Sequence, residues 1–174
     1  MSRLSWLWED GKSQEEEAWD CFVEACGEYG EARRRLFETD PLPSVRKALA
    51  GGDGRFAALQ LLRDVGWDRP ELVQAVVPEL YACSLGLGPP GIFARLVLRR
   101  LGESGHRYAE DLPTQLAPLV AATLREEVTD VFAMNALGML MDDVGDPALL
   151  ARWREAVSAS PDEDVRELLE LFED

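Results

Sequence analysis

The chain has 174 residues, the usual length of one domain, and is long enough to bury a core without disulfides or metals. Asp and Glu number 33 against 18 Lys and Arg, which gives a net charge of −15 spread evenly along the chain. This charge disfavours nucleic acid and anionic membrane surfaces as partners and favours a basic protein surface or a cation. The same excess would also serve solubility alone, and composition leaves both interpretations open.

Cysteine usage and hydropathy indicate where the chain resides. Cys21, Cys26 and Cys83 form no metal-binding motif, and dispersed thiols are typical of a reducing cytosol. The first ten residues are too short in apolar length for a signal peptide, and no stretch approaches the ~20 apolar residues of a membrane span. We therefore expect a soluble, cytoplasmic protein without a cofactor.

The first helix is predicted from a capping box, in which Ser13 is the N-cap and Glu16 the third helical residue. Apolar residues follow at the spacing of an amphipathic helix up to Tyr29. Gly27 and Gly30 predict a break before a second helical piece over 31–38.

Two further expectations concern this N-terminal part. Trp6, Leu7 and Trp8 are expected to fold back on the first helices, the alternative being an exposed apolar end. The basic triplet over 33–35 is expected to form ion pairs along the helix with Glu28, Glu31 and Glu38.

Helical periodicity continues through the rest of the chain, and no stretch shows the alternation of a strand. Turn residues at 40–43, 51–54 and 86–91 separate the helical stretches. Further helices are predicted over 44–50, 54–65, 69–85, 92–101, 112–124, 131–144, 147–157 and 164–172. The chain is therefore predicted to be all-α, with about nine helices mostly in antiparallel pairs.

Several helix ends are predicted from local rules. Asp53 is a candidate N-cap, and Gly66 suits the left-handed position after a helix. Pro78 is expected to kink the helix over 69–85. Asp111 is expected to cap the helix over 112–124. A second capping box is predicted at 160–163, and Asp146-Pro147 is predicted to begin a helix.

The stretch 130–145 is predicted to be the central helix, capped by Thr129 or Asp130. It is apolar almost all the way round, so its middle is expected to be buried on every side, Met134, Met139 and Met141 included. Its ending recurs: the segments that end at Gly66, Gly102 and Gly145 share an order of apolar residue, two charges, apolar residue and Gly. The spacings of 36 and 43 residues indicate a repeat of paired helices.

The sequence resembles the HEAT-repeat family. In that family an apolar second helix such as 77–80, Val-Pro-Glu-Leu, leads through a short acidic turn into a Val-Arg pair that opens the next repeat. The segments 160–169 and 40–49 carry such a pair, whereas the repeats that open near Gly54 and Ile92 lack it. The resemblance implies a right-handed α-α superhelix, a HEAT-like solenoid, formed by residues 40–174 and preceded by N-terminal capping helices over 1–39. It implies one domain with an extended binding face and no catalytic chemistry.

Two motifs could suggest chemistry. Gly86-Leu-Gly-Pro-Pro-Gly91 has the spacing of a dinucleotide-binding loop, but a helix precedes it and its two prolines have no N–H for a phosphate. We interpret it as a turn between repeats. His106, the one histidine, lacks a nucleophile and metal ligands at motif spacing, and is expected to be an exposed loop residue.

A cluster of acidic residues at the two ends of the central helix is the candidate binding site. Carboxylates at a helix C-terminus oppose its dipole, so the pair Asp142-Asp143 breaks a local rule. The candidate partner-binding residues are Asp142, Asp143, Asp146, Glu126, Glu127 and Asp130. They could form an acidic patch for a basic protein, a weak cation site, or a solvated turn neutralised by Arg152 or Arg154.

The expected function is therefore a non-enzymatic protein–protein interaction module with a basic partner. A bacterial immunity protein that masks a basic toxin and an adaptor are both compatible with this expectation. The alternative is a helical protein or enzyme that binds a small molecule or metal between helix pairs.

Overall fold

A computed structural model describes residues 13–51 and 53–172. The chain divides into two compact units, Met1–Pro41 and Leu42–Asp174, the second called the body below. Within the described residues the structure is all-helical, which confirms the predicted class. The elements are α1 (Gln14–Leu36), α2 (Leu42–Leu49), α3 (Arg55–Val65), α4 (Pro70–Gln74), α5 (Val77–Ser84), α6 (Pro89–Glu103), α7 (Arg107–Glu126), α8 (Val131–Val144), α9 (Pro147–Ser158), α10 (Glu163–Glu167) and the 3-10 helix η1 (Leu168–Phe172).

In the first unit, α1 is one continuous helix, so the predicted break after Gly30 is wrong. The predicted capping box is confirmed: Ser13 Oγ accepts from the Glu16 amide at 3.2 Å, and Glu16 Oε2 accepts from the Ser13 amide at 2.7 Å. The glycines are tolerated because the flanking residues favour a helix. The predicted lid at Trp6–Trp8 lies outside the described residues.

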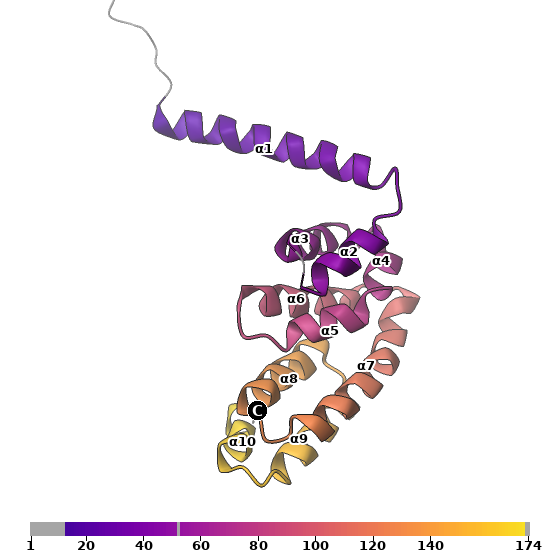
Figure 1. Ribbon diagram of the computed structural model, residues 1–174, viewed down its shortest axis with the longest axis vertical. Helices are drawn as coiled ribbons and strands as arrows, with labels where there is room; N and C mark the ends of the chain where they lie inside the picture. The colour runs from indigo at the N-terminus through magenta and orange to yellow at the C-terminus, as the bar shows by residue number, and fades with distance from the viewer. Residues whose placement is uncertain (1–12, 52, 173–174) are drawn as a thin grey trace, which may run out of the picture. The chain divides into compact units, whose positions relative to one another are not determined.

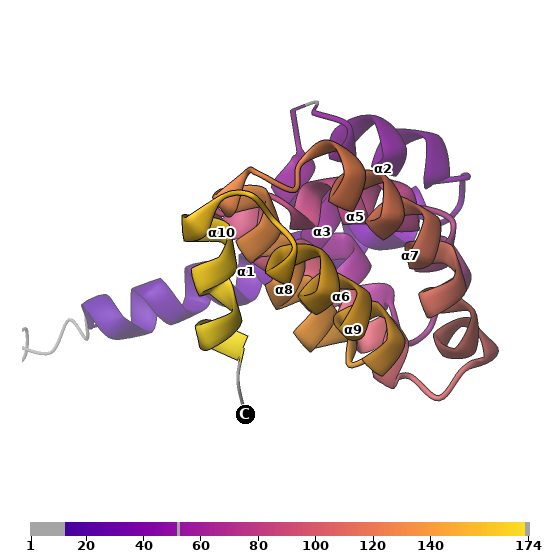
Figure 2. The same cartoon turned by 90° about the horizontal axis from the view of Figure 1, so that it is seen from below.

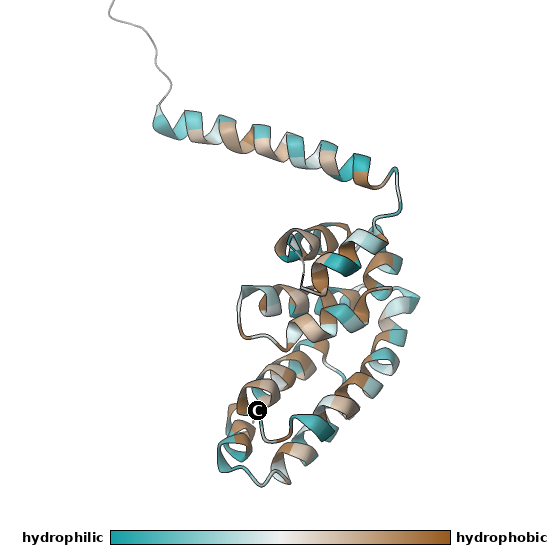
Figure 3. Ribbon diagram, viewed as in Figure 1, coloured by the Kyte–Doolittle hydropathy of each residue, from teal (hydrophilic) through white to brown (hydrophobic). Residues whose placement is uncertain are grey.

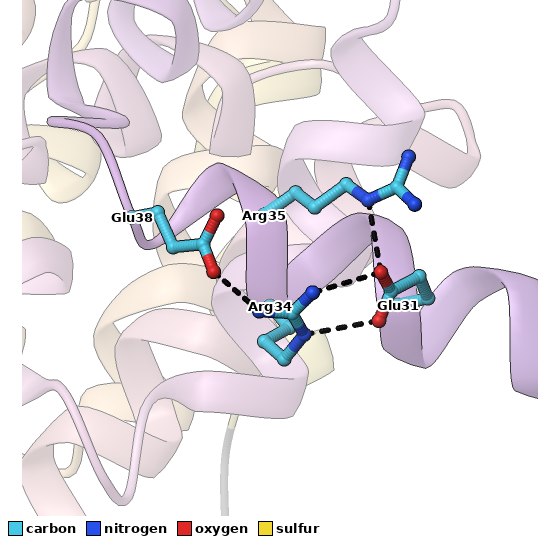
Figure 4. A network of polar contacts seen from close by, with 4 residues as sticks. All are labelled: Glu31, Arg34, Arg35 and Glu38. Atoms are coloured by element: carbon cyan, nitrogen blue, oxygen red, sulfur yellow. Dashed lines mark hydrogen bonds and ion pairs between the residues drawn. The ribbon is translucent and has the colours of Figure 1, made fainter.

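Ion pairs reinforce the last turns of α1 (Figure 4). Glu31 accepts from Arg34 and from Arg35, each at 2.9 Å, and Arg34 also pairs with Glu38. The predicted pairing within the helix is thus confirmed for Glu31 and Glu38. The neighbouring guanidinium groups lower the pKa of Glu31 below its usual value.

The body has two rows of helices (Figures 1 and 2). The first row contains α2, α4 and α5, α7 and α9, and the second contains α3, α6, α8 and then α10 with η1. Within each row every helix packs on the next one, and the rows also pack on each other, as α5 does on α6. Consecutive pairs of helices therefore lie side by side along the body.

Neighbouring helices of a row run in the same direction. Phe56 of α3 contacts Phe93 of α6 near the start of both helices, and Arg100 donates to the Arg63 carbonyl near the end of both. Both contacts join residues 37 apart in sequence. The first row repeats this arrangement: Arg46 pairs with Glu79, and one turn later Leu49 accepts from Cys83.

Leucine is the commonest residue of the core, and Leu62, Leu80, Leu98 and Leu137 are all fully buried. Trp153 fills the C-terminal end of this core. Its Nε1 donates to the Met134 carbonyl at 2.9 Å, and its ring packs edge-on against the Phe172 ring, with 4.9 Å between the ring centroids. Gly138 permits this packing, because a Cβ there would lie 2.6 Å from the tryptophan ring.

Arginines satisfy the carbonyl groups left free at helix ends. Arg95 donates to the Ser84 carbonyl at the end of α5, and Arg100 donates to the Arg63 carbonyl in the last turn of α3. Arg46, Arg154 and Arg166 make similar bonds to carbonyls at or beyond the ends of other elements. A cation at a helix C-terminus also complements the helix dipole, so these side chains tie neighbouring helices together.

Four predicted helix ends are wrong. The predicted helix over 69–85 is two helices, because the chain turns at Ala75–Val76 and Pro78 lies in the first turn of α5. Gly66 has a φ of −57°, so it is not left-handed, whereas Gly145 is, at +70°. The N-cap of α3 is Gly54, at φ +92°, rather than Asp53. Helix α7 begins at Arg107, one turn before the predicted Asp111 cap.

The second predicted capping box is also replaced by another arrangement. Asp162 caps α10, and its carboxylate accepts from the Asp164 amide. The buried Ser160 hydroxyl instead donates to the Val128 carbonyl at 2.9 Å and accepts from the Asp162 amide. Ser160 therefore bonds to the α7–α8 connection instead of acting as the N-cap that the local pattern predicts.

Candidate protein-binding surface

Asp143 forms a salt-bridged site within the second row. Its carboxylate lies 3.7 Å from Arg95 Nε and 3.8 Å from Arg99 NH1, both on α6, and its side chain is only 26% exposed. Arg152 and Arg154 of α9, which the sequence suggested as neutralising residues, do not fill this role; Arg154 binds the Phe172 carbonyl. The compensation missing from the local sequence therefore comes from the neighbouring helix of the same row.

Burial dominates the electrostatics of Asp143. Loss of water raises its pKa above the usual carboxyl value, and Arg95 and then Arg99 oppose that rise only in part. Asp142, the adjacent residue, is exposed and forms no ion pair within 4 Å among the described residues, although its charge acts on Arg99 and Asp143. The pair is thus divided: Asp143 joins α8 to α6, and Asp142 remains available to solvent.

Two other candidate residues cap helices. The Asp130 carboxylate accepts from the amides of Phe132 and Ala133 at 2.9 and 3.0 Å, which confirms it as the N-cap of α8. Asp146 accepts from the Leu149 amide at 2.8 Å and begins α9 before Pro147, as predicted. Both carboxylates complement the positive end of a helix dipole, so each has a structural role.

The six acidic candidates do not converge on one point. Asp130 precedes the first turn of α8 and Asp143 lies in its last turn, roughly 20 Å away at the rise of a helix. Glu126 and Glu127 are exposed at the end of α7. Across the described residues, no three His, Cys, Asp or Glu side chains are close enough to hold a metal ion.

The two sequence features that could suggest chemistry, His106 and the glycine-rich segment 86–91, lie at the starts of helices. His106 is exposed and is the N-cap residue of α7, although its imidazole does not cap the helix. Only the first half of the segment 86–91 is the predicted turn: residues 86–88 connect α5 to α6, and the two prolines and Gly91 form the first turn of α6. Gly91 is required there, because a Cβ on it would lie 1.8 Å from the Gly86 carbonyl oxygen.

A cavity at the junction of α3 and α6 is too small for a ligand. It is lined by residues of α3, α6, α4 and the turn after α3, among them Leu62, Trp67 and Val97, and its volume is about 10 Å³. That is room for about one water molecule, whereas small-molecule sites are usually several hundred Å³ in volume.

Exposed large apolar side chains of the body gather on the second row. They are Phe56, Trp67, Leu87, Ile92, Leu96, Phe132, Met139 and Leu171, hereafter the second-row surface. Each lies on α3, α6, α8 or η1 or in a turn next to one of them. Among the described residues, the first-row helices α2, α4, α5, α7 and α9 expose no large apolar side chain.

Helical geometry explains why these side chains face solvent. On α6, Ala94, Leu98 and Leu101 are buried and face the first row. Ile92 and Leu96 lie on the opposite side of the same helix, at 100° per residue. On α8, Phe132 and Met139 are two turns apart, share a face, and are 64% and 40% exposed.

The sequence interpretation missed this surface because α8 seemed apolar on every side. The prediction that it is buried all round is wrong: Met134 and Met141 are buried, whereas Met139 is not. The available signal was the spacing Phe132–Met139–Asp142, which places two large apolar residues in line with a charge. A buried helix rarely carries a carboxylate in line with its core residues.

Comparisons with known proteins add no family to this description. None of the protein-family models, curated proteins or solved structures compared with the chain matches it. A search of the described residues also finds no helix of the length and hydropathy needed to span a membrane.

Proposed function

We propose that the body is a HEAT-like, right-handed α-α superhelix that acts as a non-enzymatic protein-binding module through its second-row surface. The two rows of helices and the parallel direction of neighbours within a row support the repeat architecture. Stacked helix pairs of this kind present one row of helices as an extended face, which suits a protein partner better than a small ligand.

The distribution of exposed apolar side chains carries the proposal. Soluble proteins expose single apolar residues anywhere, but a concentration on one face marks an interaction site. Here the concentration follows a whole row of helices and includes three aromatic residues, Phe56, Trp67 and Phe132. Aromatic side chains supply much of the binding energy at protein interfaces.

Charge defines the chemistry of the partner. Residues 42–174 carry 22 acidic and 13 basic residues, and the end of the second row is especially acidic. Glu163, Asp164, Glu167 and Glu170 on α10 and η1 are exposed, as is Asp142 on α8. A partner with apolar anchors and a basic rim complements this surface, whereas nucleic acid does not.

A cytoplasmic basic protein is therefore the partner we propose. An immunity protein that masks a basic toxin and an adaptor both belong to this class. The alternative of a small-molecule or metal site gains no support from the cavity at α3 and α6 or from the grouping of metal ligands.

The test introduces pairs of negative charges, by substitution to Asp, on either the second row or the first. Leu96→Asp with Met139→Asp adds two charges to the second-row surface, and the matched control Ala82→Asp with Ala151→Asp adds two charges to exposed positions of the first row. Tagged wild type, variant and control are used to purify partners from the source cell, and bound proteins are identified by mass spectrometry.

We expect wild type and control to retain one basic protein that the second-row variant loses by at least tenfold. Thermal melts of all three proteins check that folding is intact. Retention of the same partner by the second-row variant, or loss by the control alone, would refute the assignment of the surface.

A further inference from the structure

The helices of the second row change in charge from one end of the row to the other. Helices α3 and α6 contain five arginines and two acidic residues, whereas α8, α10 and η1 contain six acidic residues and one arginine. The first end of the row therefore has a net charge of +3, in a chain whose total is −15. The helices of the first row contain six residues of each sign.

The second-row surface extends across both charged ends. Every helix or turn of the row except α10 contributes at least one exposed large apolar side chain, from Phe56 on α3 to Leu171 on η1. Figure 3 shows that α8 is mainly hydrophobic, whereas α10 is mainly hydrophilic. Packed helices lie about 8 to 10 Å apart, so the three steps from α3 to α10 cover roughly 25 to 30 Å. A partner segment that covers the whole surface therefore meets both charges.

Arg100 is the available cation at the basic end. Its side chain is exposed, its NH1 donates to the Arg63 carbonyl at 3.0 Å, and it has no carboxylate within 4 Å in the part of the chain that the structure describes. Arg63 pairs with Asp64 and lies over the Phe93 ring, 5.4 Å from its centroid. Both arginines line the small cavity beside Trp67. A carboxylate next to an apolar side chain complements this end of the surface.

The acidic end presents several carboxylates without a cation. Those exposed are Asp142, Glu163, Asp164, Glu167 and Glu170, and none of them forms an ion pair within 4 Å with another described residue. Arg166, the one base on these elements, donates to the Ser160 carbonyl instead. Lysine or arginine side chains of a partner complement this end.

We propose that the second-row surface binds a partner segment of divided charge, acidic where it covers α3 and α6 and basic where it covers α8, α10 and η1. This inference rests on the proposed function and specifies the partner further. A segment that is basic throughout would bring its cations against Arg100 and Arg63. Because charges are screened over about 8 Å at physiological salt, the two ends act separately and fix the direction of the segment along the row.

The first experiment selects peptides on the full chain. Immobilised wild type is offered a display library of random 20-residue peptides, which are long enough to cover about 30 Å even as a helix. Each selected peptide is then tested on the variant Leu96→Asp with Met139→Asp. We expect peptides with acidic residues near one end, basic residues near the other and apolar residues between them, which bind the variant at least about tenfold more weakly.

The outcomes separate this inference from the proposed function. Peptides that are basic along their whole length and still depend on Leu96 and Met139 would overturn the divided charge and leave the surface assigned as before. Selection of no peptide above background would overturn a single segment as the occupant. Peptides that bind the variant as tightly as wild type would count against the proposed surface itself.

Charge exchange between chain and peptide tests the direction. Arg100→Glu is expected to weaken a selected peptide at least about fivefold, and exchange of the peptide's acidic residues for Lys is expected to restore binding to within about twofold. Glu167→Lys with Glu170→Lys should require the opposite exchange, at the basic end of the peptide. Arg100→Gln, which removes the charge with a smaller disturbance, should weaken the unmodified peptide as well.

A matched control on the first row measures the effect of charge alone. Arg152→Glu and Glu155→Lys make the same changes at exposed positions of α9 and should leave binding within about twofold. A fold weakened by loss of the Arg100 bond to the Arg63 carbonyl would not recover when the peptide is changed. Equal losses in the α9 variants, or rescue of Arg100→Glu by exchange at the basic end of the peptide, would overturn the proposal.

Discussion

Arg95 of α6 and Asp143 of α8 join two neighbouring helices of the second row through a mostly buried ion pair, Nε to Oδ2 at 3.7 Å. The same guanidinium donates to the Ser84 carbonyl at the end of α5, so one side chain connects three helices. Arg95 is 6% exposed, and its charge is stabilised by both contacts.

Replacement of Arg95 by Met is expected to reduce the free energy of unfolding by about 2 to 3 kcal/mol. Methionine fills similar space but leaves the shielded Asp143 carboxylate without its nearest cation, which is costlier than losing a surface pair. Urea denaturation measures the change. Arg99→Met is the matched control: its side chain is 50% exposed, and the expected loss is under about 1 kcal/mol. Equal losses in the two variants would contradict this account.

The stability of wild type relative to Asp143→Asn should rise as pH falls. Burial raises the folded-state pKa of Asp143 above its ordinary value of 3.8, so between these two values the folded chain binds a proton that the unfolded chain does not. The stability that the Asp143 carboxyl contributes is fully present below pH 3.8 and is lost as the pH rises through the folded-state pKa. Denaturation of both proteins from pH 4 to pH 7 measures the trend; a constant difference would refute it.

The first turn of α6 should not tolerate a side chain at Gly91. An added Cβ would lie 1.8 Å from the Gly86 carbonyl oxygen, and because that atom is backbone, one of the two segments must move. We expect Gly91→Ala to cost about 2 kcal/mol or more. At Gly88, the N-cap residue of α6, the nearest atom is a Pro90 carbon at 3.7 Å, and Gly88→Ala should change stability by less than about 0.5 kcal/mol. Thermal melts of both variants make the comparison.

The two possible roles of Asp130, capping and partner binding, can be separated by two substitutions. Asp130→Ala removes the acceptor for the Phe132 and Ala133 amides and is expected to destabilise the protein by about 1 kcal/mol. Asp130→Ser removes the charge but keeps a capping oxygen, and should retain nearly wild-type stability. If the serine variant binds the proposed basic partner as wild type does, Asp130 acts through the fold; a weakened complex would show that its charge contacts that partner.

Much of the secondary structure could be predicted because it depends on interactions between residues close together in the sequence. The capping box at Ser13, the Asp130 cap and the Asp146-Pro147 start all depend on contacts within three residues, and all three are confirmed. Errors arose where a distant partner competes for the same group. Ser160 bonds to Val128 across 32 residues instead of capping its helix, and the chain divides at Val76 to fit α4 and α5 around α6.

The candidate site was predicted only in part, for a related reason. Asp142 and Asp143 were singled out because they oppose the helix dipole, but their separate roles depend on α6, which lies more than forty residues earlier. The apolar spacing of α8 could not show which of its faces a neighbour covers. Phe132 and Met139 could be recognised as surface residues only once the packing of α8 against α6, α9 and η1 was known.

The sequence by itself determined that the chain is helical, where most helices begin, and that similar helix ends recur, because these follow from hydrogen bonds and apolar spacing a few residues long. Only the tertiary structure decided which helices are neighbours, that Asp143 is paired with Arg95, and that the exposed apolar residues of the body share one row. The physical reason is that burial and ion pairing depend on what lies across a helix interface, which a local pattern does not specify.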